Sequence, residues 1–389
     1  MLFRSPFAQW GAQATRWLVP QDTTIPANLL DGYSAYGEAH SDTKSYAVFA
    51  QATWNVTEKL HLTPGMRYTY EEKFGSFAQT VSGGLAPANA NELARKNAIA
   101  AAQSYSTSFD DGSVSGQANV AYDVTDDILA YATYSRGHKS GGINLAGIPS
   151  DSSGNPVLAT AVIKPEDATT YEVGVKNQFF DRKLTLNLAA FLNEVNDFQV
   201  NIVDTAGGGS LRGYLANVEK VSSRGLELDG FVTLNEHLSG YLSAAWTEGR
   251  YDSFKNGVCP LELTGNNTTA CDLSGKPLAG LSKWVVSGGA EYRQTVFDGT
   301  GYLGVDAVYR SAAYSDASDS KYLLIPGYSV FNLRSGYVSS GSWEAFFWIK
   351  NLFDTHYFQY LQAQPGASGA VFGLLGDPRT FGFTVRVKY

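Results

Sequence analysis

The chain shows a repeated pattern in which every second residue is apolar. In the last segment the apolar and aromatic members are Phe381, Phe383, Val385, Val387 and Tyr389. Residues 60–71, 113–122 and 184–193 show the same alternation. Successive side chains of a β-strand point to opposite faces, so this pattern predicts strands whose two faces meet different surroundings. The apolar face of these strands prefers hydrocarbon.

About thirteen such segments follow one another, and we expect each to form a strand. Their ranges are 45–55, 60–71, 113–123, 128–136, 169–179, 184–203, 214–234, 237–251, 283–294, 301–310, 327–338, 343–351 and 380–389. Short turns alternate with long connections, which are 72–112, 137–168, 204–213, 252–282, 311–326 and 352–379. A meander with tight turns at one end and long loops at the other is typical of an outer-membrane β-barrel, and this parity places the C-terminus on the periplasmic side.

Bacterial barrels normally have an even number of strands, so a fourteenth strand is expected near the N-terminus or upstream of it. Residues 1–18 contain Pro6 and predict at most a weak strand. We therefore divide the chain into an N-terminal remnant, loop or weak strand at 1–44 and a barrel portion at 45–389. Residues 90–104 are rich in helix formers and predict a helix inside an outer loop.

The composition fits a surface that is partly covered by something other than water. Charged residues make up 17% of the chain, against a usual value of about 25%. No run approaches the roughly 18 consecutive apolar residues of a transmembrane helix. The net charge of -8 argues against nucleic acid as a partner. Tyrosines near the predicted strand ends are expected to form interfacial girdles, and these are Tyr131, Tyr134, Tyr171, Tyr328, Tyr337 and Tyr357.

The two cysteines, Cys259 and Cys271, lie in one polar segment that is typical of a surface loop. An even number of cysteines in one loop favours a local disulfide in an oxidising compartment, and the missing C-x-x-C pairs argue against zinc. Two unpaired thiols in a reducing compartment are the alternative. The residues after Met1 do not show the charged, apolar and small-residue succession of a signal peptide.

The sequence predicts no catalytic, cofactor or metal site. The histidines His40, His61, His138, His237 and His356 are scattered and lack metal-ligand spacing. Residues 299–304 fit G-x-G-x-x-G, but a strand follows instead of a helix, which indicates a hairpin turn. Polar residues on the second strand face are expected to line an aqueous interior, and they are Arg67, Glu71, Gln117, Asn119, Asn187, Asn193, Asn332, Arg334, Arg386 and Lys388.

Four phrases of the sequence resemble segments of the TonB-dependent outer-membrane receptors of Gram-negative bacteria. They are YATYSRGHKSGG at 131–142, KPE at 164–166 followed by YEVGVK at 171–176, NLFD at 351–354, and GDPRT at 376–380 before the final alternating strand. Each phrase is short, but all four occur in the family's order and within the same succession of strands. Residues 45–71 extend the resemblance, which thus covers most of the chain.

The resemblance implies a non-enzymatic receptor for a scarce ligand such as a ferric siderophore, cobalamin or a carbohydrate. Such receptors have a barrel of about 22 strands whose lumen is closed by a plug, and TonB pulls on that plug. The C-terminal residues from Phe381 to Tyr389 resemble the signal that the barrel assembly machinery recognises. No plug-like segment precedes residue 45, so the chain resembles the C-terminal portion of the barrel, a partial barrel of about 13–14 strands in the outer membrane.

Two other functions remain open at this point. A shortened barrel without a plug would form a passive pore. A soluble periplasmic β-propeller or sandwich enzyme would instead show repeats of about 40–50 residues and a convergent carboxylate or histidine site, and the sequence shows neither. The sequence does not identify the ligand, because specificity lies in the long loops and in the plug.

Overall fold

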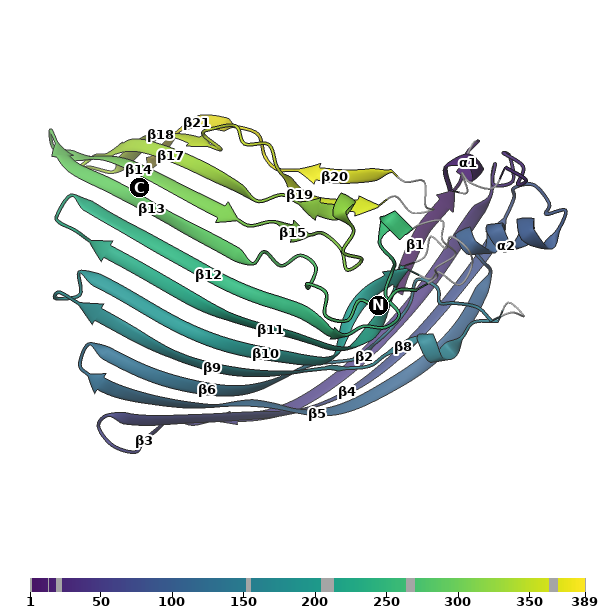
Figure 1. The fold of residues 1–389 in the computed structure, drawn as a ribbon, viewed down its shortest axis with the longest axis horizontal. Helices are drawn as coiled ribbons and strands as arrows, with labels where there is room; N and C mark the ends of the chain where they lie inside the picture. Colours follow the sequence, from purple (N-terminus) through teal and green to yellow (C-terminus); the bar gives the residue numbers. More distant parts are fainter. Residues whose placement is uncertain are drawn as a thin grey trace.

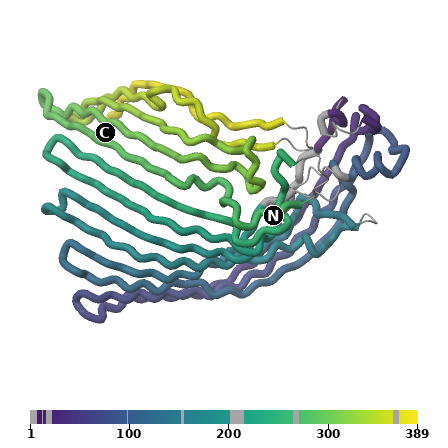
Figure 2. Tube along the Cα trace, viewed as in Figure 1, coloured from purple at the N-terminus to yellow at the C-terminus, as the bar shows by residue number. Residues whose placement is uncertain are grey.

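The computed structural model describes residues 2–12, 14–18, 23–151, 155–203, 213–263, 270–363 and 370–388. They form one large, strongly curved antiparallel sheet, with tight turns at one end and helices, hairpins and long connections at the other (Figure 1). The colour changes gradually across the sheet, because strands that are neighbours in sequence are also neighbours in space (Figure 2). We refer to the two ends as the turn end and the loop end.

The sheet holds 15 strands, of which fourteen follow one another across it and β3 pairs beside them with β4. The strands are β1 (Leu2–Gln9), β2 (Ser34–Gln51), β3 (Trp54–Asn55), β4 (Leu60–Ser82), β5 (Gln103–Thr125), β6 (Ile128–Lys139), β9 (Glu166–Phe179), β10 (Leu184–Val203), β11 (Gly213–Thr233), β12 (Leu238–Ser253), β13 (Trp284–Val296), β14 (Gly299–Arg310), β17 (Tyr328–Val338), β18 (Trp343–Lys350) and β21 (Thr380–Val387). The barrel is not closed, because β1 pairs with β2 alone and β21 with β18 alone.

Smaller elements lie in the long connections at the loop end. They are α1 (Ala14–Leu18), α2 (Ala90–Ile99), β7 (Gly142–Ile143), η1 (Leu158–Thr160), β8 (Val162–Ile163), η2 (Leu261–Leu263), β15 (Ala313–Tyr314), η3 (Lys321–Leu323), β16 (Leu324–Ile325), β19 (Phe358–Ala363) and β20 (Val371–Leu375). The predicted helix is confirmed as α2, whose N-cap Asn89 accepts a hydrogen bond from the Glu92 amide. Among the described residues, no helix combines the length and apolarity needed to cross a membrane.

The predicted strands and the alternation of turns are confirmed, but several strands extend further at the loop end. The strand expected at 45–55 begins at Ser34 as β2, and the strands expected at 60–71 and 113–123 run over Leu60–Ser82 and Gln103–Thr125. Residues 1–44, expected to be a remnant, loop or weak strand, contain β1 and the first part of β2.

The two faces of the sheet differ in chemistry along continuous rows. One apolar row runs across five strands through Val175, Leu188, Leu228, Ala244 and Val286. The row beside it is polar and runs through Lys176, Asn187, Asp229, Ser243 and Ser287. We call these the apolar face and the polar face. Because pairing is in register, each strand contributes its apolar residues to the same side.

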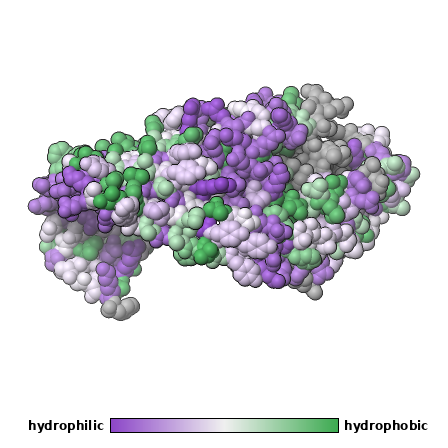
Figure 3. Space-filling view, turned by 90° about the horizontal axis from the view of Figure 1, so that it is seen from below, coloured by the Kyte–Doolittle hydropathy of each residue, from purple (hydrophilic) through white to green (hydrophobic). Residues whose placement is uncertain are grey.

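The apolar face is exposed in the isolated chain. Val173, Leu188 and Leu226 keep 57%, 44% and 56% of their accessible surface. Figure 3 shows hydrophobic residues exposed at the molecular surface, interspersed with hydrophilic ones. Soluble proteins rarely expose contiguous apolar surface of this extent, whereas membrane-spanning sheets require it. The apolar face therefore indicates contact with lipid.

Buried hydrophobic clusters lie at the loop end. One cluster joins the ends of β10 to β12 to the following connection through Val195, Val218, Val221, Tyr251, Phe254 and Leu273. A second cluster joins Leu30, Tyr33 and Ala35 to Ile99 and Ala100 at the C-terminal end of α2. Water reaches both sides of the strands beyond the bilayer, so these parts need a conventional core. The loop end is therefore stabilised by buried hydrophobic clusters, as a soluble protein is.

Two tyrosines of the polar face lie across glycines of the neighbouring strand. A Cβ atom added at Gly174 would meet the Tyr131 ring at 2.6 Å, and one added at Gly336 would meet the Tyr302 ring at 2.7 Å. The Tyr131 hydroxyl donates to Glu172 at 2.7 Å. The prediction that Tyr131 belongs to a lipid-facing girdle is therefore wrong, because Tyr131 faces the polar side. Tyr134 and Tyr171 do lie together on the apolar face, with ring centroids 5.3 Å apart.

A pair of arginine substitutions tests the assignment of the faces. Leu188→Arg places a charge on the apolar face and is expected to lower the free energy of unfolding in lipid vesicles by about 2–4 kcal/mol. Asn187→Arg, one residue away on the polar face and opposite Asp229, is expected to change it by less than about 1 kcal/mol. Denaturant titration of the chain in vesicles measures both values. Equal losses for the two variants would contradict the assignment.

Candidate functional site

The connection between β6 and β9 folds back over the sheet instead of extending away from it. We call its described residues, 140–151 and 155–165, the strap, which carries β7, η1 and β8. β7 contacts β4 and β5, whereas β8 contacts β5 and β11. β5 and β11 are four places apart in the sheet, or about 19 Å at the usual strand spacing. A short segment reaches both only if the sheet curves around it, so the strap lies on the concave side.

Side chains of β4 and β5 hold the first part of the strap. Lys73 Nζ donates to the Gly141 carbonyl at 2.7 Å, and the Tyr105 hydroxyl donates to the Asn144 carbonyl at 2.7 Å. Gln103 Nε2 donates to the Ile148 carbonyl at 2.6 Å, and its Oε1 accepts from the Ile148 amide at 3.1 Å. Ile148 and Ala161 are fully buried against Phe77 and Tyr105. Hydrogen bonds and buried apolar contacts therefore both hold this part of the strap against β4 and β5.

Side chains of β10 and β11 hold the other part of the strap. Asn217 Nδ2 donates to the Lys164 carbonyl at 2.9 Å, while its Oδ1 accepts from the Lys164 amide at 2.8 Å. Gln199 Nε2 donates to the carbonyls of Ser140 and Lys164, both at 3.1 Å. In the opposite direction, the side chain of the strap residue Asn144 makes two hydrogen bonds with the Leu215 backbone of β11, at 2.9 and 3.0 Å. Amide side chains thus satisfy strap backbone groups that lack a sheet partner.

A cluster of charged residues lies where the strap leaves β6 and enters β9. His138 Nε2 lies 2.6 Å from Asp111 Oδ2, and its Nδ1 lies 3.0 Å from Asp167 Oδ1. Lys139 Nζ donates to Glu166 Oε1 at 3.0 Å. The His138 side chain is only 11% exposed. These pairs bind together the two sequence phrases at 131–142 and 164–166.

The other two phrases also meet each other, at the loop end of β18 and β21. Asn351 is buried, and its Nδ2 donates to the carbonyls of Thr355 and Asp377 at 2.9 and 3.0 Å. Asp354 Oδ1 accepts from the Arg379 amide at 2.9 Å. The NLFD and GDPRT phrases therefore close the base of one long connection, which carries the β19–β20 hairpin.

The connection after β12 contains both cysteines, and the structure joins Cys259 to Cys271 in a disulfide. The Gly257 amide donates to the Cys271 carbonyl, and the Cys271 amide donates back to Gly257, both at 2.9 Å. Hydrogen bonds from Ser274 hold the pKa of Asp272 below its usual range. The loop is thus fixed at its centre by a covalent bond and at its base by the hydrophobic cluster around Phe254.

The polar residues expected to line an interior lie on the polar face, where several of them pair with neighbouring side chains. Asn119 Nδ2 donates to Thr133 at 2.7 Å, and Arg334 Nη2 donates to Glu291 at 3.0 Å. Within the described ranges, no group of three metal-ligating side chains gathers at one point.

The C-terminal residues keep their predicted alternation. Phe381, Phe383, Val385 and Val387 lie on the apolar face and remain 72%, 69%, 55% and 56% exposed. Tyr389 lies outside the described residues. The strap anchors Gln103, Asn144, Gln199 and Asn217 were not predicted, because single amides at strand ends carry no periodic signal.

Together, the unclosed meander of tilted strands, the exposed apolar face and the polar concave face define the class of membrane β-barrel proteins. Residues 3–352 match the family model described as TonB dependent receptor-like, beta-barrel. The chain therefore belongs to the TonB-dependent receptor family.

Relatives and solved structures agree with this assignment. The chain is 24% identical over 364 residues to a probable TonB-dependent siderophore receptor, PiuA, of Acinetobacter baumannii, covering 92% of this chain and 43% of that protein. It is 24% identical over 380 residues to the catecholate siderophore receptor Fiu of Escherichia coli, covering 95% and 44%. The ferric yersiniabactin uptake receptor FyuA of Yersinia pestis superposes with a TM-score of 0.70 at 17% identity, covering 92% and 47%. The chain spans less than half the length of each of these proteins.

Removing one wall amide tests how the strap is held. Asn217→Ala takes away both hydrogen bonds to the Lys164 backbone, each worth about 1 kcal/mol. We expect the Lys164 amide to exchange its hydrogen about tenfold faster, while the amides of β10 and β11 keep their protection. Asn119→Ala, which removes a polar-face amide away from the strap, is the control. Unchanged exchange at Lys164 would show that other contacts hold the strap.

Reducing the disulfide tests the loop between β12 and β13. A crosslink that closes a loop of this size contributes about 3 kcal/mol in the chain-entropy model. We expect Cys259→Ser with Cys271→Ser to speed tryptic cleavage after the exposed Lys255 several-fold, with no change in the sheet. Reductant should act on the parent chain in the same way and have no effect on the double variant. Cleavage that is insensitive to both changes would contradict a structural role for the disulfide.

Proposed function

We propose that this chain is the barrel portion of an outer-membrane receptor that takes up a ferric siderophore with energy from TonB. The family assignment and the siderophore-receptor functions that the names of PiuA, Fiu and FyuA state support this proposal. The observation that carries it is the strap, which narrows the concave side at the loop end while the rest of the polar face stays open. A passage of this form admits a bound ligand and hinders free diffusion.

The open edges of the sheet indicate what else the receptor needs. β1 and β21 each leave one row of backbone groups unpaired, and unpaired backbone is not tolerated inside a bilayer. Receptors of this kind have about 22 strands and a plugged lumen. We infer that further strands and a plug, supplied by polypeptide other than these residues, close the barrel, and that TonB acts through that plug. The alternation from Phe381 to Val387 would present this edge to the barrel assembly machinery.

The β19–β20 hairpin is our candidate for ligand contact at the loop end. One face of this hairpin carries two exposed aromatic rings: Tyr360 keeps 43% of its surface and Phe372 51%. Asn351 and Asp354 fix the base of this connection, as described above. Aromatic rings stack on flat aromatic groups, and the name of Fiu specifies a catecholate siderophore. We therefore infer a ligand whose iron-chelating groups are aromatic.

The disulfide supports a location outside the cytosol. Disulfides persist in oxidising compartments, among them the bacterial periplasm and the cell surface. Cys259 and Cys271 belong to the loop end, which in our orientation faces the cell exterior. This position agrees with the outer membrane as the site of action.

Ligand binding tests the proposal directly. The chain, reconstituted in lipid vesicles together with the polypeptide that completes its barrel, is titrated with the ferric complex of a tris-catecholate, and binding is followed by quenching of tryptophan fluorescence. Tyr360→Ala with Phe372→Ala should weaken binding about tenfold, because the two rings lie on the same face of the hairpin and each lost aromatic contact is worth about 0.5–1.5 kcal/mol. Phe347→Ala, which removes an exposed ring from the apolar face instead, should leave binding unchanged.

Two results would contradict the proposal. One is a completed receptor, assembled from this chain and the polypeptide that closes its barrel, that inserts into the vesicles but binds no ferric complex. The other is a constant ion conductance of this chain alone in planar bilayers, since such conductance would mean that the barrel closes without further strands or a plug and forms a passive pore instead.

A further inference from the structure

A groove on the apolar face lies at the turn end, beside the C-terminal strand. It has a volume of about 580 Å³, which is within the range of small-molecule sites. Ser335 and Ala345 supply its floor, because their side chains are the smallest on this part of the apolar face. The surrounding rings are Phe297, Tyr337, Trp343, Phe347 and Phe383.

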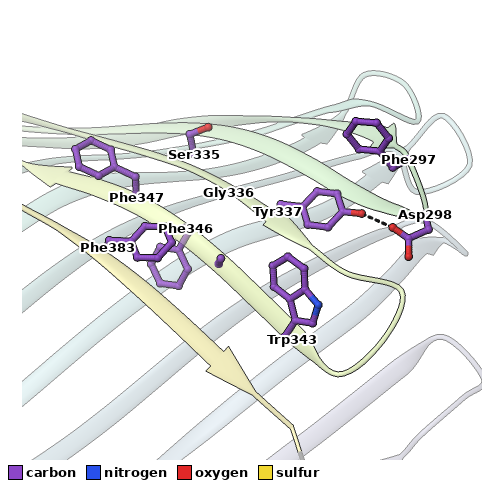
Figure 4. Close-up of a pocket in the computed structure, with 10 residues that line it drawn as sticks. Phe297, Asp298, Ser335, Gly336, Tyr337, Trp343, Phe346, Phe347 and Phe383 are labelled. Atoms are coloured by element: carbon purple, nitrogen blue, oxygen red, sulfur yellow. Dashed lines mark hydrogen bonds between the residues drawn. The ribbon is translucent and has the colours of Figure 1, made fainter.

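The rings come from four separate elements and are arranged along the groove. Figure 4 shows Tyr337 and Trp343 near the turn, with Phe347 and Phe383 further along their strands. Tyr337 and Trp343 pack at a centroid distance of 5.5 Å. Phe347 and Phe383 are paired directly across β18 and β21. The groove is thus apolar along its length, and its walls are rigid because the strands on either side are hydrogen-bonded in register.

The end of the groove at the turn is polar and negatively charged. The Tyr337 hydroxyl donates to Asp298 Oδ1 at 2.7 Å, shown in Figure 4, and the Ser340 hydroxyl donates to Oδ2 at 3.0 Å. These hydrogen bonds hold the pKa of Asp298 below its usual range. Across the described part of the chain, no lysine or arginine forms an ion pair with this carboxylate. Asp298 therefore carries a charge that is hydrogen-bonded but not neutralised.

Phe297, next to Asp298, combines an unusual backbone conformation with a side chain that is almost fully exposed. Its φ is 53°, a left-handed conformation that turns of this kind usually give to Gly, Asn or Asp. Its side chain is 95% exposed, which is unfavourable in water. At the boundary of a bilayer the same ring would be stabilised, because aromatic side chains concentrate at the level of the headgroups. The turn therefore holds the ring where lipid headgroups begin.

We propose that this groove holds one phospholipid from the leaflet at the turn end, with an acyl chain between the aromatic rings and a primary ammonium headgroup against Asp298. Charge complementarity selects the ammonium, and the groove is continuous with the exposed apolar face. An anionic lipid cannot form this ion pair, because a phosphate or glycerol headgroup has no cationic group to place against the Asp298 carboxylate. The inference rests on the membrane location proposed above, but not on transport or on the ligand.

Lipid retention tests this inference with the full chain. The chain is inserted into vesicles of phosphatidylethanolamine and phosphatidylglycerol with identical acyl chains, extracted in detergent, and its retained lipid is counted by native mass spectrometry. We expect phosphatidylethanolamine to be retained at least fivefold over phosphatidylglycerol. Asp298→Asn should abolish this preference and leave equal retention of both lipids.

Two further variants separate the groove from the general lipid layer. Ala345→Trp fills the floor and should reduce retention of both lipids about tenfold. Ala307→Trp lies on the apolar face of β14 outside the groove and should leave retention unchanged. Equal retention of the two lipids by the parent chain, or unaltered retention in Ala345→Trp, would mean ordinary surrounding lipid and overturn the inference. Failure of the parent chain to enter vesicles even when it is assembled with the polypeptide that completes its barrel would instead contradict the proposed membrane location itself.

Discussion

The continuous antiparallel ladder is the constraint on which the rest of this structure depends. Once Leu188 is opposite Val175 on one side and Leu228 on the other, every residue of these strands is committed to one of two faces. A slip of one residue would exchange the faces, placing Asn187 and Asp229 in hydrocarbon. The register is therefore enforced by the difference between two solvents rather than by a packed interior. Conventional hydrophobic packing begins only where the strands leave the bilayer.

The sequence was sufficient to predict the parts of the strands that meet these two solvents. Alternation located thirteen of the fourteen strands of the meander, and the alternating lengths of the connections gave its two ends. It did not locate β1, which residues 1–18 predicted at most weakly. It was insufficient for the parts that extend beyond the bilayer. Residues 34–44 of β2 include Glu38, His40 and Asp42 on the same parity as Tyr46 and Val48. Water on that side removes the apolar signal, so the strand continues where the pattern has already ended.

The strap was beyond prediction for a different reason. Its position depends on amide side chains from both walls, such as Gln103 and Asn217, which are separated by more than a hundred residues in sequence and meet only after the sheet has curved. Tyr131 illustrates the same limit, because its place near a strand end suggested a membrane girdle while Gly174 on the next strand made room for its ring on the polar side. In contrast, the phrases that resemble the receptor family were informative, because residues such as Asn351 and Glu166 close the bases of long connections.

The strap is attached to the sheet mainly through its backbone, so that most of its side chains are not needed for its attachment. Most of its bonds to the walls are made by its backbone, so the identity of most strap side chains does not affect them. Substitutions in the strap can therefore alter the shape and charge of the passage while the anchors on β5, β10 and β11 stay the same. A receptor built in this way can acquire selectivity for a new cargo through a short stretch of sequence, without any change to the wall that carries it.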